Sequence, residues 1–407
     1  MRAVFLALLC MTVITPTTPT PGRALASRPT VWLMGFVAFM NVYAMQSVLP
    51  LLVADFAATP VQAGLTVGAT ILAVALLSPV MGMVSDAWGR KGLMVGSMLA
   101  MVVPTALIPL AHSLHAVVAL RFLQGLAVPG IVVVLMAYVA EEFQPSGGVA
   151  RMISTYVAGS VMGGFSGRFL AGHAAEWWGW PGAFWLLACL TLAGALWVAW
   201  RLPPSRHFVA SRNRAAAWAV LRGHVRNRTL WAAWAVGFCV LFSLVGTFTY
   251  VNLYLAEPPF ALSAADLANV FSVYLLGVVV TPLAGRWIQR VGLLRLLLCA
   301  LALSSGGLWL TLAPAVWVVM LGLALCSCGV FVCQTCAIGF VAQHVNEGRS
   351  LATGLYNMCY YAGGAVGALA AGLAYESWHW RGAVCAMMAV QALAAAVAMV
   401  GWRVRRA

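Results

Sequence analysis

Residues 156–183 read YVAGSVMGGFSGRFLAGHAAEWWGWPGA, and residues 356–383 read YNMCYYAGGAVGALAAGLAYESWHWRGA. Aligned at an offset of 200 without a gap, the two stretches share twelve of 28 residues. Both contain glycines at matching positions and end on Trp-x-Gly-Ala. Each covers the end of one apolar block and the start of the next. The match predicts a unit of several apolar blocks that the chain uses twice.

The composition is that of a helical membrane protein. Hydrophobic residues make up 63% of the 407 residues and charged residues only 8%, against about 45–50% and about 25% in soluble proteins. So few charges cannot cover a water-facing surface, and so much apolar surface excludes disorder. The apolar residues form blocks of about twenty, as a membrane-crossing helix requires, rather than the alternation of a β-barrel. We count twelve blocks: 31–53, 62–83, 92–111, 115–139, 151–173, 181–200, 230–255, 265–288, 294–312, 314–341, 351–373 and 381–401.

The longest polar stretch, 201–229, divides these blocks into two sets of six. A six-helix unit used twice is typical of carriers that work by alternating access, with the substrate site between the halves. The sequence therefore predicts an all-α membrane protein of twelve transmembrane helices. The expected parts are a tail (1–29), a first half (30–200), a basic linker (201–229), a second half (230–402) and a basic tail (403–407).

Positive charges predict the orientation. If the first residues are inside the cell, 20 of the 23 Lys and Arg residues are inside as well. The positive-inside rule therefore places both termini in the cytoplasm. The same rule explains the net charge of +14 without nucleic acid. Residues 1–26 also resemble a signal peptide, whose cleavage would invert the orientation, so a dispensable tail and a signal both stay open. The linker segment 212–228 is either a basic surface helix on the anionic inner leaflet or a solvated linker.

The loop after the second block reads GMVSDAWGRK. Its first glycine and its acid are four residues apart and share one helix face. The loop resembles the G-x-x-x-D-x-x-G-R-K motif of the major facilitator superfamily. The resemblance implies that the acid pairs with the motif arginine and caps a helix of the opposite half, holding a cytoplasmic gate shut. The implied gate residues are Gly82, Asp86, Gly89, Arg90 and Lys91.

Block four contains Arg121-Phe-Leu-Gln124-Gly125, which resembles the R-x-x-Q-G motif of the same superfamily. A charge inside a span is costly and often functional, and the resemblance associates Arg121 with proton coupling. Arg121 is also close enough to the outer end of its block to extend to the interface, so that alternative stays open. None of the nine acids falls in the middle of a block, and Asp55 is the remaining candidate for a coupling acid.

Block five carries glycines at a spacing that allows close helix packing. It resembles the G-x-x-x-G-P-x-x-G-G motif of drug–proton antiporters, but glycine replaces the proline and arginine replaces the last glycine. Packing alone explains the spacing equally well. The residues of this motif are Gly159, Gly163, Gly164, Gly167 and Arg168.

Longer strings in both halves, among them Tyr138-Val-Ala-Glu-Glu142-Phe-Gln-Pro-Ser146 and Leu202-Pro-Pro-Ser-Arg-His-Phe208, resemble the YnfM-like branch of bacterial exporters, near the arabinose-efflux and multidrug-efflux permeases. This resemblance covers most of residues 30–401. It implies an ion-coupled carrier of the bacterial cytoplasmic (inner) membrane. It also implies that blocks 1, 4, 7 and 10 face the substrate.

The polar and aromatic residues of these four blocks predict a mostly apolar cavity without a fixed charge, suited to neutral or apolar compounds. Each of them is equally explained by helix packing. The candidates are Asn41, Tyr43, Gln46, Tyr138, Tyr250, Asn252 and Gln334.

The sequence favours a secondary transporter that exports small apolar or neutral compounds in exchange for protons. An importer of a small neutral solute and a transport-inactive sensor or scaffold remain alternatives. We predict no enzyme activity, because no nucleophile–base set or phosphate-binding loop is present. We also predict no cofactor and no metal site, since the four cysteines of block ten do not share a helix face. The expected partners are a small-molecule substrate, protons and the lipid bilayer, and we expect a monomer.

Overall fold

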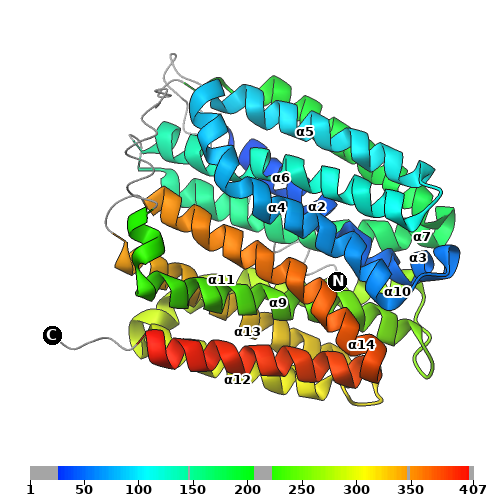
Figure 1. Ribbon diagram of the computed structural model, residues 1–407. Helices are drawn as coiled ribbons and strands as arrows, with labels where there is room; N and C mark the ends of the chain where they lie inside the picture. Colours follow the sequence, from blue (N-terminus) through cyan, green and yellow to red (C-terminus); the bar gives the residue numbers. More distant parts are fainter. Residues whose placement is uncertain (1–25, 145–146, 206–221, 346–348, 403–407) are drawn as a thin grey trace.

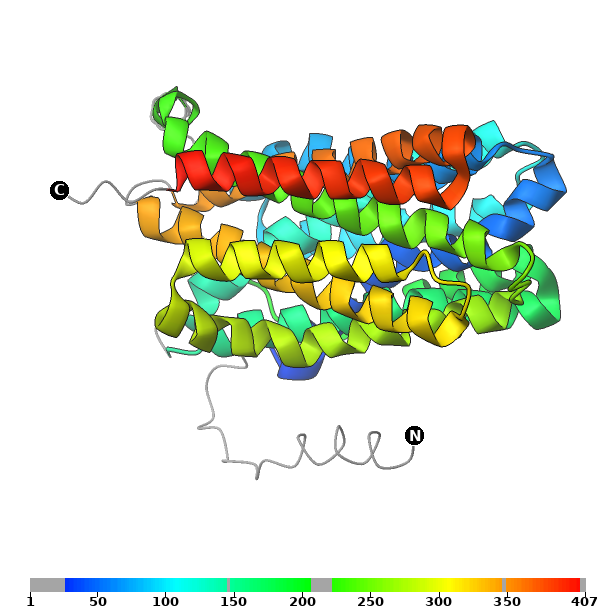
Figure 2. The same ribbon diagram turned by 90° about the horizontal axis from the view of Figure 1, so that it is seen from below.

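The structure is a computed structural model that describes residues 26–144, 147–205, 222–345 and 349–402. Every regular element in these residues is a helix (Figures 1 and 2), so the predicted all-α class is confirmed. Ten of the helices are long and apolar enough to cross a membrane. The expected tails at 1–25 and 403–407, and linker residues 206–221, lie outside the described residues. In chain order the elements are α2 (Arg28–Tyr43), η1 (Ala44–Val48), α3 (Leu49–Phe56), α4 (Pro60–Trp88), α5 (Arg90–Leu107), η2 (Ile108–Leu110), α6 (Leu114–Phe143), α7 (Val149–Arg201), α9 (Arg228–Ala256), α10 (Ala264–Val270), η3 (Phe271–Tyr274), α11 (Leu275–Val291), α12 (Leu293–Leu310), α13 (Val316–His344) and α14 (Arg349–Gly401).

Polar side chains cap the helices at their first turns. The Thr59 hydroxyl accepts a hydrogen bond from the Gln62 backbone N–H, and the Gln62 side chain accepts one from the Thr59 N–H. This reciprocal pair starts α4. Ser113 and Ser263 cap α6 and α10 in the simpler way, with one hydroxyl acceptor each. These caps satisfy backbone donors that a helix leaves open at its N-terminus.

The 53-residue helix α7 doubles back on itself at Gly179, whose φ is 69°. A Cβ on Gly159 would overlap the Trp32 backbone, and one on Gly194 would lie 2.7 Å from a methyl group of Val37. Thirty-five residues of straight helix would span about 52 Å, so Gly159 and Gly194 could not both contact neighbouring turns of α2. The chain therefore reverses between two antiparallel arms.

The 53-residue helix α14 reverses in the same way, at Trp378 and His379. The φ of His379 is 51°. Gly363 lies against the Phe238 backbone, and a Cβ on Gly401 would overlap Ala232. Both contacts are with the first eleven residues of α9. The sequence repeat thus corresponds to a structural repeat, because α7 and α14 each fold around the first helix of their own group.

The helices form two groups, before and after residues 202–227, that lie one above the other in Figure 1. Figure 2 shows the helices running side by side along one direction. We call the end of the bundle that holds Gly179 and His379 the hairpin end, and the end that holds Arg201 and Arg228 the linker end. The groups meet where α4 lies beside α14 and where α10 lies beside α7.

Two helices contain 3-10 segments that the apolar pattern did not predict. The first span is interrupted by η1 at Ala44–Val48, and the eighth by η3 at Phe271–Tyr274. A 3-10 turn changes the backbone hydrogen bonds from i→i+4 to i→i+3 and frees carbonyl groups at the junction. These two segments lie beside the buried polar groups described below.

Candidate functional site

Arg121 is fully buried and holds the interrupted end of α2. Its Nη1 donates to the Asn41 carbonyl at 2.8 Å, and its Nη2 donates to the Val42 carbonyl at 2.7 Å. Its Nε donates to the Thr66 carbonyl of α4 at 3.1 Å. Carbonyls at a helix C-terminus attract positive charge. The alternative in which Arg121 reaches the membrane interface is therefore wrong, because the side chain points into the bundle and has no exposed surface.

Asn41 belongs to the same buried network. Its amide nitrogen donates to Thr191 Oγ1 at 2.8 Å, and its oxygen accepts from Thr105 and Gln124 at 3.2 and 2.9 Å. All three partners belong to the first group of helices. Asn41 was predicted to line the substrate cavity, and the structure places its buried side chain where it joins four helices of one half.

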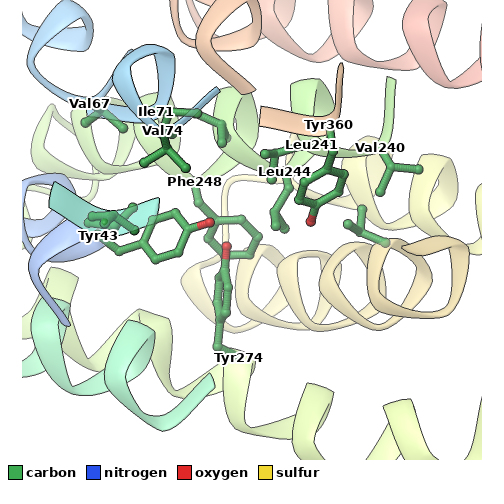
Figure 3. Close-up of a cluster of buried hydrophobic side chains, with 14 of the residues drawn as sticks. Tyr43, Val67, Ile71, Val74, Val240, Leu241, Leu244, Phe248, Tyr274 and Tyr360 are labelled. Atoms are coloured by element: carbon green, nitrogen blue, oxygen red, sulfur yellow. The ribbon is translucent and has the colours of Figure 1, made fainter. Parts of the chain in front are cut away.

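Arg168 is also fully buried, but it lies between the two groups of helices. Its guanidinium carbon lies 4.3 Å from the ring centre of Tyr43 in α2, and 4.6 and 4.3 Å from those of Phe271 and Tyr274 in η3. Its Nε donates to Gln46 Oε1 at 2.7 Å. Figure 3 shows Tyr43 and Tyr274 pointing toward each other. A guanidinium therefore lies within an aromatic cluster that includes Tyr43, one of the residues predicted to line the cavity.

The glycines next to Arg168 serve packing. A Cβ on Gly159, Gly163 or Gly167 would overlap the backbone of α2 at Trp32, Phe36 or Met40. Gly164 faces away from this contact, toward Tyr43 and Arg168 Nη1. The packing interpretation of the motif therefore accounts for three of its glycines, and Arg168 lies on the face that meets the other group.

Hydrogen bonds join the two groups in the hairpin-end half of the bundle. The Gln46 amide donates to Thr249 Oγ1 at 2.9 Å, and the Asn252 amide donates to the Gln46 carbonyl at 3.0 Å. The side-chain oxygen of Asn252 is buried and has no hydrogen-bond partner among the described residues. Gln46 and Asn252 were predicted to line the substrate cavity, and the structure brings them together as a contact between α9 and η1.

Two glutamates from the sequence repeat form matching contacts at the hairpin end. Glu176 Oε2 in α7 accepts from the Ala265 N–H at 3.3 Å, in the first turn of α10. Glu376 Oε1 in α14 accepts from the Val61 N–H at 3.0 Å, in the first turn of α4. Each carboxylate therefore lies at the N-terminus of a helix of the opposite group, where negative charge is favourable. The repeat aligned these two glutamates, but the sequence did not indicate their partners.

Replacing both glutamates with glutamine should loosen the hairpin end. Each carboxylate at a helix N-terminus contributes about 0.3–1 kcal/mol, so amide exchange at Val61 and Ala265 should rise about two- to fivefold for each contact. Hydrogen–deuterium exchange measures this rise. Glu257→Gln is the matched control, because Glu257 is an exposed glutamate that accepts from the Tyr375 hydroxyl within its own group. Unchanged exchange in the Glu176→Gln/Glu376→Gln double variant would contradict this role.

The gate loop lies at the linker end. Gly89, with φ 92°, both ends α4 and starts α5. Arg90 is buried and forms a bidentate ion pair with Glu141 of α6, with Nη2 2.5 Å and Nε 3.1 Å from the carboxylate oxygens. Glu141 is a partner that the sequence did not predict. Gly82 and Lys91 are half-buried, and the side chain of Asp86 lies outside the described residues.

The remaining candidates do not meet in one place. The Tyr138 hydroxyl donates to the Pro203 carbonyl at 3.3 Å, and the Tyr250 hydroxyl donates to the Ala368 carbonyl at 2.5 Å. Gln334 is half-buried in α13. Asp55 is exposed near the hairpin end and accepts from Trp180 Nε1 at 2.5 Å. Within the described residues, no group of three His, Cys, Asp or Glu side chains could hold a metal ion.

Comparison with known proteins identifies the family. A sequence model of the Major Facilitator Superfamily matches residues 31–258 and 257–407. The chain belongs to the Major Facilitator Superfamily. It is 32% identical to the inner membrane transport protein YnfM of Escherichia coli, over 91% of this chain and 88% of that protein. It is 31% identical to the MFS-type transporter YybF of Bacillus subtilis, over 86% of this chain and 87% of that protein.

Solved structures agree with this assignment of the fold. A bacterial homologue of the human lysosomal transporter Spinster superposes with a TM-score of 0.79 at 14% identity, covering 92% of this chain and 96% of that one. The nucleoside transporter NupG superposes with a TM-score of 0.77 at 13% identity, covering 92% and 100%. The chain is therefore a multi-pass membrane transporter of the Major Facilitator Superfamily and not an enzyme, as the sequence predicted.

Proposed function

We propose that this protein is a secondary active transporter that works by alternating access and exports small compounds with an apolar or aromatic body in exchange for protons. The observation that carries the proposal is the contact at the hairpin end. Apart from the hydrogen bond from Arg168 to the Tyr274 hydroxyl, its hydrogen bonds between groups involve neutral side chains, backbone groups and two exposed glutamates. Water can replace such partners at small net cost, so the groups can separate there without unfolding.

The proposal includes twelve membrane crossings with both termini in the cytoplasm. It counts the antiparallel arms of α7 and α14 as two crossings each, which adds two to the ten long apolar helices. The linker end then faces the cytoplasm, as the distribution of 20 of 23 positive residues supports. The membrane would be the bacterial inner membrane, for which YnfM is named.

Export is supported by the resemblance of the glycine motif to that of drug–proton antiporters and by one partial similarity. The chain is 29% identical to the multi-drug resistance efflux pump PmrA of Streptococcus pneumoniae over 137 residues, which is 33% of each protein. For proton coupling we retain Arg121 and Asp55 as candidates. Gly82, Asp86, Gly89, Arg90 and Lys91 are proposed as the cytoplasmic gate.

The proposal is tested with proteoliposomes that contain a pH-sensitive dye and carry an imposed proton gradient. The panel contains lipophilic cations, neutral antibiotics, pentoses and small aromatic acids. We expect at least one class of compound to trigger proton movement. Equilibration of a labelled compound without proton movement would favour a facilitator or importer. Failure of every compound in both assays would contradict the proposed function and favour a sensor or scaffold.

Asp86→Asn is expected to slow this proton movement about tenfold, because its carboxylate is proposed to hold the cytoplasmic gate shut in one half of the cycle. The measurement is the initial rate of dye response at a fixed compound concentration. Glu257→Gln serves as the comparison variant, since it also removes one exposed negative charge but lies outside the gate loop. A rate for Asp86→Asn equal to that of the unmodified protein would refute the assigned gate role.

A further inference from the structure

We propose that Arg168 binds the negatively charged group of the transported compound, and that the substrates are therefore small organic anions with an apolar or aromatic body. This inference rests on the proposed transport function and specifies the substrate class of the same interface. It replaces the neutral substrate that the sequence predicted.

Arg168 has no negatively charged partner among the described residues. The hydrogen-bond acceptors of Arg168 are Gln46 Oε1, the Gly164 carbonyl and the Tyr274 hydroxyl, all of them neutral. Among the described residues no carboxylate binds Arg168, and none of the nine acids of the sequence falls in the middle of an apolar block. A buried charge without a counterion is costly and is retained mainly at functional sites. An anionic substrate would supply the missing counterion.

Arg168 also has N–H groups that its described hydrogen bonds do not use. A guanidinium has five N–H groups. Arg168 uses the single one on Nε and one on each terminal nitrogen in the bonds that the structure describes. One N–H on Nη1 and one on Nη2 remain. Two such donors are what arginine uses to bind a carboxylate through two parallel hydrogen bonds.

One partly accessible side chain covers Arg168. The ring of Tyr43 covers one face of the guanidinium, and the exposed fraction of Tyr43 is 9%. Gly164, one turn before Arg168 in α7, is buried, and its carbonyl accepts from Nη1 at 2.8 Å. Tyr43, which keeps a small exposed fraction, is therefore the side chain that separates Arg168 from accessible surface. Rotation of the Tyr43 side chain would uncover the guanidinium, while the aromatic rings stay available to an apolar body.

The two halves differ at the position of Arg168. Arg168 aligns with Ala368 in the sequence repeat. Ala368 is fully buried, and its Cβ would lie 3.2 Å from a Cβ on Gly68, so this position in the second half only packs α14 against α4. Features shared by the two repeats build the common scaffold. The guanidinium occurs in one half only, which fits a role in substrate recognition.

The test measures binding with a matched pair of probes. Phenylacetate and phenylacetamide have nearly the same shape, and only phenylacetate is charged. The purified full-length protein in detergent is titrated with each compound while the midpoint of thermal unfolding is recorded. We expect phenylacetate to raise the midpoint and phenylacetamide to have a clearly smaller effect. In Arg168→Gln the affinity for phenylacetate should fall at least about 30-fold, as for removal of one partner of a buried charge pair.

Two further variants keep the test decisive. Arg168→Lys retains the charge but loses the forked donors, so it should bind phenylacetate with intermediate affinity and remains informative if Arg168→Gln does not fold. Arg201→Gln removes an exposed positive charge that stacks on Trp200 at the linker end and should bind like the unmodified protein. Equal shifts with both probes, equal shifts in the unmodified protein and its Arg168 variants, or no shift at all would overturn the inference. Binding does not require flux, so this result and the proteoliposome result can fail independently.

Discussion

Gly163→Ala should abolish the stable fold, because α2 and α7 approach each other too closely to admit a methyl group. A Cβ on Gly163 would overlap the carbonyl, carbonyl carbon and Cα of Phe36. All three are backbone atoms, so no side-chain rotation relieves the overlap. Overpacking with backbone displacement typically costs about 1–3 kcal/mol and occasionally more, which is a large share of the stability of a typical protein. Gly363→Ala should have the same effect, since Gly363 meets the Phe238 backbone in the same way.

The measurement is fluorescence-detected size-exclusion chromatography of detergent extracts, followed by thermal unfolding of any monodisperse protein. Gly96→Ala is the matched control, because a Cβ at Gly96 in α5 meets no atom within 4 Å. We expect the control to match the unmodified protein and both other variants to aggregate or to melt at a much lower temperature. Normal behaviour of Gly163→Ala would show that the helices do not pack as described.

Arg121→Leu should also cause a large loss of stability. Leucine fills much of the volume, but it leaves the carbonyls of Asn41, Val42 and Thr66 without the donors that Arg121 provides. An unsatisfied buried polar group costs about 1–3 kcal/mol. Arg121→Lys should be intermediate, because one ammonium group cannot reach all three carbonyls in the geometry of a guanidinium.

The two Arg121 variants are compared by thermal unfolding and by proton movement in proteoliposomes. Arg286→Gln is the control for the loss of one positive charge, since Arg286 is exposed in α11. We expect the order of stability to be unmodified protein, Arg121→Lys, Arg121→Leu. If Arg121→Leu is as stable as the unmodified protein but transports no protons, the role of Arg121 is coupling alone and its structural role is refuted.

The sequence predicted the all-α class and the repeat because both depend on short stretches of the chain. Apolar blocks of about twenty residues require helices in a bilayer, and glycines at a spacing of four allow close helix contacts. The reversal at Gly179 occurs at a glycine with positive φ two residues before Pro181, and it falls within the quoted repeat. The reversal in α14 has no such glycine, since His379 takes the positive φ, and it was indicated by the repeat and by the break between the apolar blocks 351–373 and 381–401.

The buried polar contacts were harder to predict, because they depend on which helix faces meet. Asn41 and Arg168 both lie within apolar blocks, and the sequence alone did not separate a packing role from a place between the halves. The 3-10 segment η1 frees the carbonyls that Arg121 binds, and no residue pattern in Ala44–Val48 indicated that this segment would form. The same holds for Glu141, whose pairing with Arg90 joins residues 51 positions apart.

In the proposed transport cycle, the two groups of helices separate at the hairpin end. Cysteines at positions 68 and 368 test it in a background without native cysteines, because the two Cβ atoms would lie 3.2 Å apart, near the separation of about 3.5–4.5 Å in a disulfide. Proton movement is measured in proteoliposomes with a compound that drives the unmodified protein, before oxidation, after oxidation and after reduction. We predict that the disulfide stops proton movement, that reduction restores it, and that Gly68→Cys alone is insensitive to oxidation. Undiminished proton movement in fully cross-linked Gly68→Cys/Ala368→Cys protein would contradict the account.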